Sequence, residues 1–195
     1  MASRQLKNIF LSASIPIAER DRVYIETADV IAIRDAVIAL ATTVLPKHRL
    51  IWGGHPSITP LINYVMLKQK KNIQEHVKLY QSLWFEDVFL EDNNKFENIV
   101  FTEKQHDIPS SIKLMRERML SENEFAAGIF IGGMNGIEDE YKMFREYHPE
   151  AIIIPLASTG AASKLLYENM IDPNERFLKD YAFSSIFQEF LIDKI

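Results

Sequence analysis

The sequence of 195 residues contains no cysteine and only seven glycines. The absence of cysteine excludes disulfides, a thiolate nucleophile and cysteine-based metal sites. Its five histidines are not spaced as pairs of metal ligands, so we expect no bound metal and no cofactor. No apolar run reaches the roughly 18 residues of a membrane span. The N-terminus also lacks a signal-peptide pattern, and the chain is expected to be soluble and cytoplasmic, without contact to a membrane.

A marked excess of positive charge is also missing. The chain has 22 lysines and arginines against 27 acidic residues, which gives a net charge of −5 at pH 7. Nucleic-acid binding usually depends on a basic surface and is therefore not expected. Hydrophobic residues make up 47% of the chain, enough at this length for one globular domain spanning residues 1–195.

The few glycines are concentrated where strands are expected to end. Six of the seven lie in three short segments, at residues 53–54, 132–136 and 160, and each segment follows an apolar run. Glycine permits positive φ angles and lets a ligand approach the backbone closely, and a helix start beyond it favours phosphate. The three loops together predict a ligand-binding crevice at the carboxyl edge of a parallel sheet. The alternative is a set of tight turns without a ligand.

The spacing of apolar residues predicts strands that alternate with helices. We expect strands near residues 8–11, 50–52, 78–85, 99–101, 125–131 and 151–155, and helices near residues 21–44, 58–70, 110–121, 138–147, 160–170 and 174–190. This alternation predicts an α/β, Rossmann-like fold, a doubly wound parallel sheet in a three-layer αβα sandwich. Right-handed crossovers would bring every loop that follows a strand to the same edge.

Small and polar residues at that edge are the candidate ligand-binding residues. Ser12 and Ser14 end the first strand, and their hydroxyls suit either helix capping or phosphate binding. His55 is compatible with a ligand contact or with an exposed loop position. The candidates after the later strands are Gly53, Gly54, His55, Gly132, Gly133, Met134, Asn135, Gly136, Thr159 and Gly160. No segment matches GxGxxG or GxxxxGK[ST], so a standard NAD(P) dehydrogenase and a P-loop NTPase are excluded.

Charged residues flank the third glycine segment. Glu138 and Glu140 follow it on a helix and project about 200° apart, so only one of them can face the crevice. Their favourable position at the positive end of a helix is the structural alternative. Arg116 and Arg118 lie on the preceding helix. Arginine is suited to hold an anionic ligand, and surface ion pairs are the equally good structural explanation.

In this order, the motifs resemble those of the SLOG superfamily, whose best-known branch is the Lonely Guy cytokinin-activating phosphoribohydrolases. That branch has a serine loop after strand one, a glycine-rich loop after strand two, M-x-x-R-K on a helix and P-G-G-x-G-T-x-x-E. The corresponding segments here are 12–14, 53–54, 115–118 and 132–140, and the resemblance spans residues 6–165. Ile131 replaces the proline, Ile137 the threonine and Met119 the lysine. These departures favour a divergent branch of the kind associated with nucleotide-derived signals and antiviral conflict systems.

The resemblance implies that the chain cleaves the N-glycosidic bond of a nucleotide or nucleotide-derived small molecule. The family's glutamate falls on Glu140. The loop at residues 132–136 has one residue more than the family's pattern, and if this residue shifts the register, Glu138 is the substitute. The family's arginine falls on Arg118, which would hold phosphate or assist the leaving base. The serines and glycines of the loops would then form the phosphate cradle.

Two other function classes remain open. A non-catalytic sensor would use the same crevice to bind a nucleotide second messenger or an NAD-derived signal, and would act through an effector protein partner. A TIR-like NAD hydrolase shares the short first strand ending in serine, but the glycine-rich third loop and its acidic helix argue against it.

A homodimer is typical of the family that the chain resembles. Near the C-terminus, apolar residues recur at helical spacing and could either form such an interface or cover the sheet. These residues are Phe183, Ile186, Phe187, Phe190 and Leu191.

Overall fold

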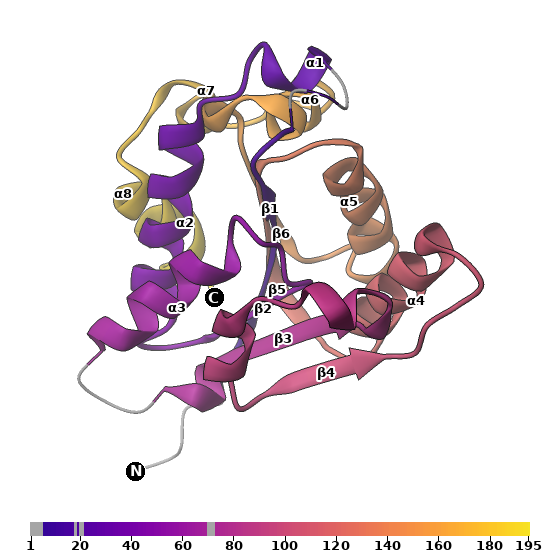
Figure 1. Cartoon of the computed structure of the whole chain (residues 1–195). Helices are drawn as coiled ribbons and strands as arrows, with labels where there is room; N and C mark the ends of the chain where they lie inside the picture. The colour runs from indigo at the N-terminus through magenta and orange to yellow at the C-terminus, as the bar shows by residue number, and fades with distance from the viewer. Residues whose placement is uncertain (1–5, 18, 20–21, 70–72) are drawn as a thin grey trace.

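The computed structural model describes residues 6–17, 19, 22–69 and 73–195, and its centre is a six-stranded sheet (Figure 1). The strand order is β4-β3-β2-β1-β5-β6, and every neighbouring pair is parallel. The strands are β1 (Asn8–Ser14), β2 (Arg49–Trp52), β3 (Val77–Ser82), β4 (Ile99–Thr102), β5 (Phe125–Gly132) and β6 (Ile152–Leu156). The predicted α/β, Rossmann-like fold is thereby confirmed.

Helices cover both faces of the sheet and complete three layers (Figure 1). One face carries α2 (Val30–Val44), α3 (Thr59–Lys68) and α8 (Phe183–Phe187), and the other carries α4 (Ile108–Ser121) and α5 (Asn135–Tyr147). The remaining segments are α1 (Arg22–Ile25), α6 (Ala161–Glu168), α7 (Arg176–Lys179), the 3-10 turns η1 (Gln74–His76), η2 (Leu83–Val88), η3 (Glu91–Lys95) and η4 (Ala157–Thr159), and the π turn η5 (Gln188–Ile192). Within the described ranges, no helix is long and apolar enough to cross a membrane.

Buried residues alternate along the strands between two hydrophobic cores. In β1, Ile9 and Leu11 belong to the core beneath α2, whereas Phe10 belongs to the core beneath α5. Phe10 stacks on Phe144 of α5, with ring centroids 5.2 Å apart. Because successive side chains of a strand point to opposite faces, Ser12 lies on the same face as Phe10.

The connections diverge at β1 and β5, which lie side by side in the sheet. After β1 the chain passes through α2 to β2, and after β5 it passes through α5 to β6. Because α2 and α5 cover opposite faces, the two outgoing loops separate at the carboxyl ends of these strands. In open parallel sheets, ligands bind beside such a switch point. The fold thus positions the expected site at the ends of β1 and β5.

Some expected elements are divided or end earlier than their apolar pattern indicates. The helix expected at residues 21–44 is interrupted, because Asp29 caps α2 by accepting a hydrogen bond from the Ala32 N–H at 2.9 Å. The strand expected at residues 78–85 ends at Ser82, whose hydroxyl accepts a hydrogen bond from the Trp84 N–H and begins η2. Residues 21 and 70, the expected limits of two helices, lie outside the described residues.

The apolar C-terminal residues are part of the core. The helix expected at residues 174–190 is divided into α7 and α8, followed by η5. Phe183, Ile186, Phe187 and Leu191 are buried together with residues of α2 and of the sheet, whereas Phe190 is partly buried. These four side chains therefore cover the sheet rather than forming an exposed interface.

Candidate functional site

The candidate site begins at the carboxyl end of β1. Ser12 and Ser14 both lie on the α5 side of the sheet, and they are 1% and 8% exposed. The Ser12 hydroxyl donates a hydrogen bond of 2.5 Å to Oε2 of Glu140. The structure therefore joins the serine loop and the acidic helix, two motifs that are separated by 128 residues in the sequence.

Glu140 is the centre of a short chain of charged contacts. Its second oxygen, Oε1, accepts a hydrogen bond of 2.9 Å from Nε of Arg116 in α4. The two side chains are 15% and 16% exposed, so water screens their interaction only in part. Asp139 lies 3.7 Å from the same guanidinium and is more than half exposed. Both carboxylate oxygens of Glu140 are thus held in one orientation by partners from β1 and α4.

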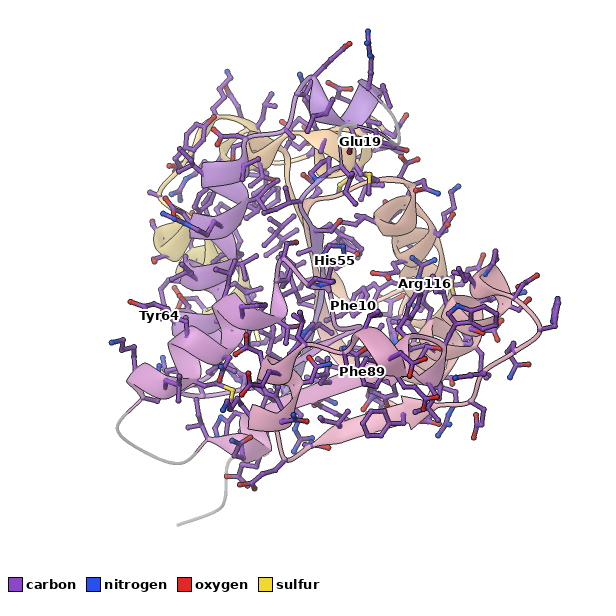
Figure 2. The ribbon with its side chains drawn as sticks, viewed as in Figure 1. Phe10, Glu19, His55, Tyr64, Phe89 and Arg116 are labelled. Atoms are coloured by element: carbon purple, nitrogen blue, oxygen red, sulfur yellow. The ribbon has the colours of Figure 1, made fainter. Side chains whose placement is uncertain are left out.

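Local sequence explains how Arg116 reaches this position. Asp107 caps α4 by accepting a hydrogen bond from the Ser110 N–H at 2.8 Å, which also lowers the pKa of the Asp107 carboxyl. Gly136 in the first turn of α5 has no side chain, and a β-carbon there would lie 2.7 Å from Nη2 of Arg116. The glycine therefore leaves room for the guanidinium between α4 and α5 (Figure 2).

Arg118 takes a different direction from the same helix. Its Nε donates a hydrogen bond of 2.7 Å to Glu122, and Nη1 lies 3.7 Å from Glu103. This pairing raises the pKa of Arg118 and lowers the pKa of Glu122. The arginine that the motif comparison selected is therefore placed in a surface ion pair, and Arg116 is the arginine in contact with Glu140.

Glu138 faces away from Glu140 and contacts the segment after β1. Its Oε1 accepts a hydrogen bond of 2.6 Å from the hydroxyl of Tyr24, a buried residue of α1. The divergence of the two glutamates matches their expected 200° separation on a helix, about two residues at 100° each. Glu138 holds α1 against α5, and Glu140 points toward the end of β1.

The glycines after β5 are enclosed by their neighbours. The Gly132 N–H donates to the hydroxyls of Thr159 and Ser163, at 3.0 and 3.1 Å, and the Gly133 N–H donates to the Ser14 carbonyl at 2.8 Å. Because of these hydrogen bonds, both backbone N–H donors are used inside the protein. Both glycines also have positive φ angles, 59° and 76°.

The start of α5 offers the remaining backbone groups of this loop. Met134 is its N-cap residue and makes no side-chain cap hydrogen bond. The Met134 side chain is buried in the core beneath α5, whereas Asn135 is exposed. An uncapped helix start presents N–H groups that suit an anion. Within this segment, the turn at the start of α5 has no side-chain cap, whereas the amides of the glycine pair are bonded inside the protein.

Thr159 and Gly160 form the support of the β5 loop. Thr159 is fully buried, and its hydroxyl donates to the Leu156 carbonyl at 2.5 Å. A β-carbon at Gly160, which has a φ angle of 71°, would collide with the carbonyl of Thr27. The Ala161 N–H is occupied by the Thr27 hydroxyl at 2.9 Å. These contacts tie the segment before α2 to the start of α6.

The loop after β2 lies beside the same edge. Nδ1 of His55 is 2.8 Å from the hydroxyl of Ser57, and that hydroxyl accepts a hydrogen bond of 3.2 Å from the Ile15 N–H. Ser57 therefore ties the loop after β2 to the loop after β1, with His55 half-buried beside it (Figure 2). Gly53 lies beside α4, and a β-carbon at Gly53 would lie 3.0 Å from the end of the Met115 side chain.

Sequence reasoning missed several residues that build this site: Tyr24, Ser57 and Ser163. Each is a common residue type whose role depends on a partner distant in the sequence or on the exact path of a loop. For Arg116 the sequence left a surface ion pair and a ligand contact open, and the family motif points to its neighbour Arg118. Among the described residues, no group of three or more histidine or acidic side chains could hold a metal ion.

The comparisons with known proteins agree with this architecture. The SLOG cluster3 family matches residues 23–191 of the chain. A solved X-ray structure of a protein designated TM1055 is 16% identical to it, with a TM-score of 0.58, and the match covers 88% of this chain and 89% of that one. This likeness concerns the fold. No curated protein sequence matches. Because the family match covers most of its length, the chain belongs to the SLOG cluster3 family.

Proposed function

We propose that the protein hydrolyses the N-glycosidic bond of a nucleotide or nucleotide-derived ligand bound at the carboxyl ends of β1 and β5. One observation carries this proposal: the carboxylate of Glu140 is held between the Ser12 hydroxyl and the Arg116 guanidinium at the switch point of the sheet. A fixed, half-buried carboxylate beside the ends of these strands is the group that such a reaction needs.

The contacts of Glu140 hold its carboxylate in one orientation. Arg116 supplies a positive charge at 2.9 Å, and the Ser12 hydroxyl supplies a hydrogen bond to the other oxygen. During hydrolysis, the bond between the anomeric carbon and the base breaks while positive charge develops on the ribose. Water supplies a hydroxyl to that carbon, and its proton passes through the carboxylate toward the nitrogen of the departing base. Glu140 stabilises the charge and orients the water.

The other groups bind and position the ligand. The uncapped turn of α5 from Met134 to Gly136 accepts the phosphate. Ser12 acts on Glu140 rather than on phosphate, because its single hydroxyl proton is already donated. Arg116 takes the role that the motif comparison gave to Arg118, and it is close enough to Glu140 to contact the same ligand.

A second candidate function is a non-catalytic sensor. The observation that favours it is the enclosure of the Gly132 and Gly133 amides by Thr159, Ser163 and Ser14. With these amides used inside the protein, the loop offers few donors that could stabilise a transition state, whereas a sensor needs no such stabilisation. In this alternative, ligand binding changes the contact with an effector protein.

Product analysis separates the two functions. The purified protein is incubated with nucleotides, NAD, ADP-ribose and cyclic nucleotides, and the products are identified by mass spectrometry. Release of a free base is expected, and Glu140→Gln should slow it at least about a hundredfold, a typical contribution of acid–base catalysis. Glu146→Gln, an exposed carboxylate on the same helix, is the matched control and should leave the rate unchanged.

Two outcomes would contradict the hydrolase. If base release continues at the same rate in Glu140→Gln, this carboxylate has no part in the chemistry. If ligands are recovered intact but remain bound to the protein, the sensor is the correct function.

A further inference from the structure

Gln81 is a polar side chain with unused hydrogen-bonding capacity near the site. It follows Tyr80 in β3 and is 7% exposed. Within the described part of the chain, its amide makes no hydrogen bond, and neither amide atom is among those fully enclosed. Burying an amide without a hydrogen-bond partner costs free energy. Because this amide has no partner in the protein and still reaches the surface, a bound ligand is the natural group to pair with it.

The neighbours of Gln81 place it beside the glycine loop after β2. A β-carbon at Gly54 would collide with Nε2 of Gln81 and would lie 2.9 Å from Leu79, so the loop passes directly over this amide. Gly53, one residue earlier, faces Met115 of α4 instead. The two glycines thus connect the α3 side of the sheet, where Gln81 lies, with the α4 side, where Arg116 lies.

In this arrangement, one ligand could contact both Glu140 and Gln81. Strand register places Leu11, Trp52 and Leu79 at one level across β1, β2 and β3, and Gln81 is two residues further along. Two strand spacings separate β1 from β3, on the order of 10 Å. A nucleoside is long enough to extend from Glu140 across the end of β2. At that point Gly53 and Gly54 have no side chains that would block it.

We propose that Gln81 recognises the base of the bound nucleotide, with its amide donating to one atom of the base edge and accepting from the next. A carboxamide offers one donor group and one acceptor side by side, the pattern that pairs with adjacent acceptor and donor atoms of a nucleobase. The ligand class is therefore a nucleotide with an intact base, not a sugar phosphate. This inference rests on the proposed location of the ligand and adds the residue that selects its base.

The test compares the binding of three probes by calorimetry: AMP, GMP and ribose 5-phosphate. Gln81→Leu removes both hydrogen bonds, and we expect at least tenfold weaker binding of the preferred nucleotide with unchanged binding of ribose 5-phosphate. Gln81→Glu presents two acceptors, which oppose the N1 acceptor of adenine and match the N1–H and N2–H donors of guanine. It should therefore shift the ratio of AMP to GMP affinity at least tenfold toward GMP. Gln105→Leu, an exposed glutamine after β4, is the control.

The outcomes distinguish this inference from the proposed hydrolysis. A change in base preference without base release would support Gln81 as the reader and overturn the hydrolase. Base release that is insensitive to both Gln81 variants would support the hydrolase and overturn the inference. Equal weakening of all three probes would show that Gln81 has a structural role and would overturn the inference. If the wild-type protein bound none of the three probes, the inference would be overturned, whereas the hydrolase would still be decided by the product analysis.

Discussion

Two glycine loops at the same edge of the sheet have different surroundings. After β5, Gly132 and Gly133 are packed against Ile33 and Ile137, and their N–H groups are bonded to buried or backbone oxygens. After β2, Gly53 and Gly54 adjoin the flexible ends of Met115 and Gln81. The first loop is held by rigid neighbours and internal hydrogen bonds, and the second is bordered by side chains that can move.

The difference shows that a glycine pair after a strand has more than one physical purpose. In the β5 loop, positive φ angles and tight packing require glycine even without a ligand. In the β2 loop, Gly54 also has a positive φ angle, 57°, but Gly53 does not, and the side chain nearest to Gly53 is the flexible end of Met115. Substitutions in the β5 loop should therefore change stability most, and a substitution at Gly53 in the β2 loop should mainly change ligand binding.

The largest effect is expected for Gly133→Ala. A β-carbon there would collide with Ile137, and the φ angle of 76° is unfavourable for alanine. Backbone strain and overpacking each cost about 1–3 kcal/mol, so we expect the free energy of unfolding to fall by about 3 kcal/mol. Urea denaturation measures the change.

A second variant separates the two causes of that loss. Ile137→Ala removes the side chain that a β-carbon at position 133 would meet. In the Ile137→Ala background, Gly133→Ala should cost only the backbone strain, about 1–2 kcal/mol. An equal cost in both backgrounds would contradict the packing argument.

The next effect concerns the acceptors of the Gly132 N–H. Thr159→Val combined with Ser163→Ala leaves this buried donor without a partner, which should lower the free energy of unfolding by about 1–3 kcal/mol. Either single variant should cost less, because the other hydroxyl still accepts. Ser57→Ala in the β2 loop is the comparison, since water can replace a half-buried hydroxyl. Equal losses of stability at the two loops would contradict the conclusion that the β5 loop depends on internal hydrogen bonds more than the β2 loop does.

The fold could be predicted because its main elements have strong, regular apolar patterns. Alternation between two cores identifies β1, and helical spacing identifies α2 and α5. The errors occurred where one local hydrogen bond overrides the pattern. Asp29 divides a long amphipathic segment by capping α2, and Ser82 ends β3 by accepting from the Trp84 N–H. Such bonds depend on side-chain geometry that apolar spacing does not report.

The site was only partly predictable, because motifs identify segments better than side-chain directions. Ser12 and Glu140 were both selected, and the structure brings them into contact. The choice between Arg116 and Arg118 depends on the rotation of α4, whose buried face includes Met115 and Met119. Both arginines flank that face. Which one contacts Glu140 is decided by the position of α5 and the space above Gly136, and neither is visible in the α4 sequence.

A smaller effect on stability is expected for Gly53→Ala. Its φ angle is not positive, and the nearest atom to a new β-carbon is the flexible end of Met115 at 3.0 Å. The free energy of unfolding should change by less than about 0.5 kcal/mol. Nucleotide binding should weaken nonetheless, because the methyl group would occupy the path between Glu140 and Gln81. Unchanged affinity in calorimetry would show that the ligand does not cross this loop.

The smallest effect is expected at Arg118, which contacts neither loop. Arg118→Met should leave base release unchanged, whereas Arg116→Met should reduce it, because only Arg116 contacts Glu140. The pKa of Glu122 is lowered in the folded protein, so its pairing with Arg118 stabilises the fold above the ordinary carboxyl pKa of 4.5 and is lost as the pH falls through the lowered value. Urea unfolding should therefore show a small loss of stability in Arg118→Met at pH 7 that disappears toward pH 3. A difference that persists in acid would mean that Arg118 stabilises α4 by packing rather than by charge.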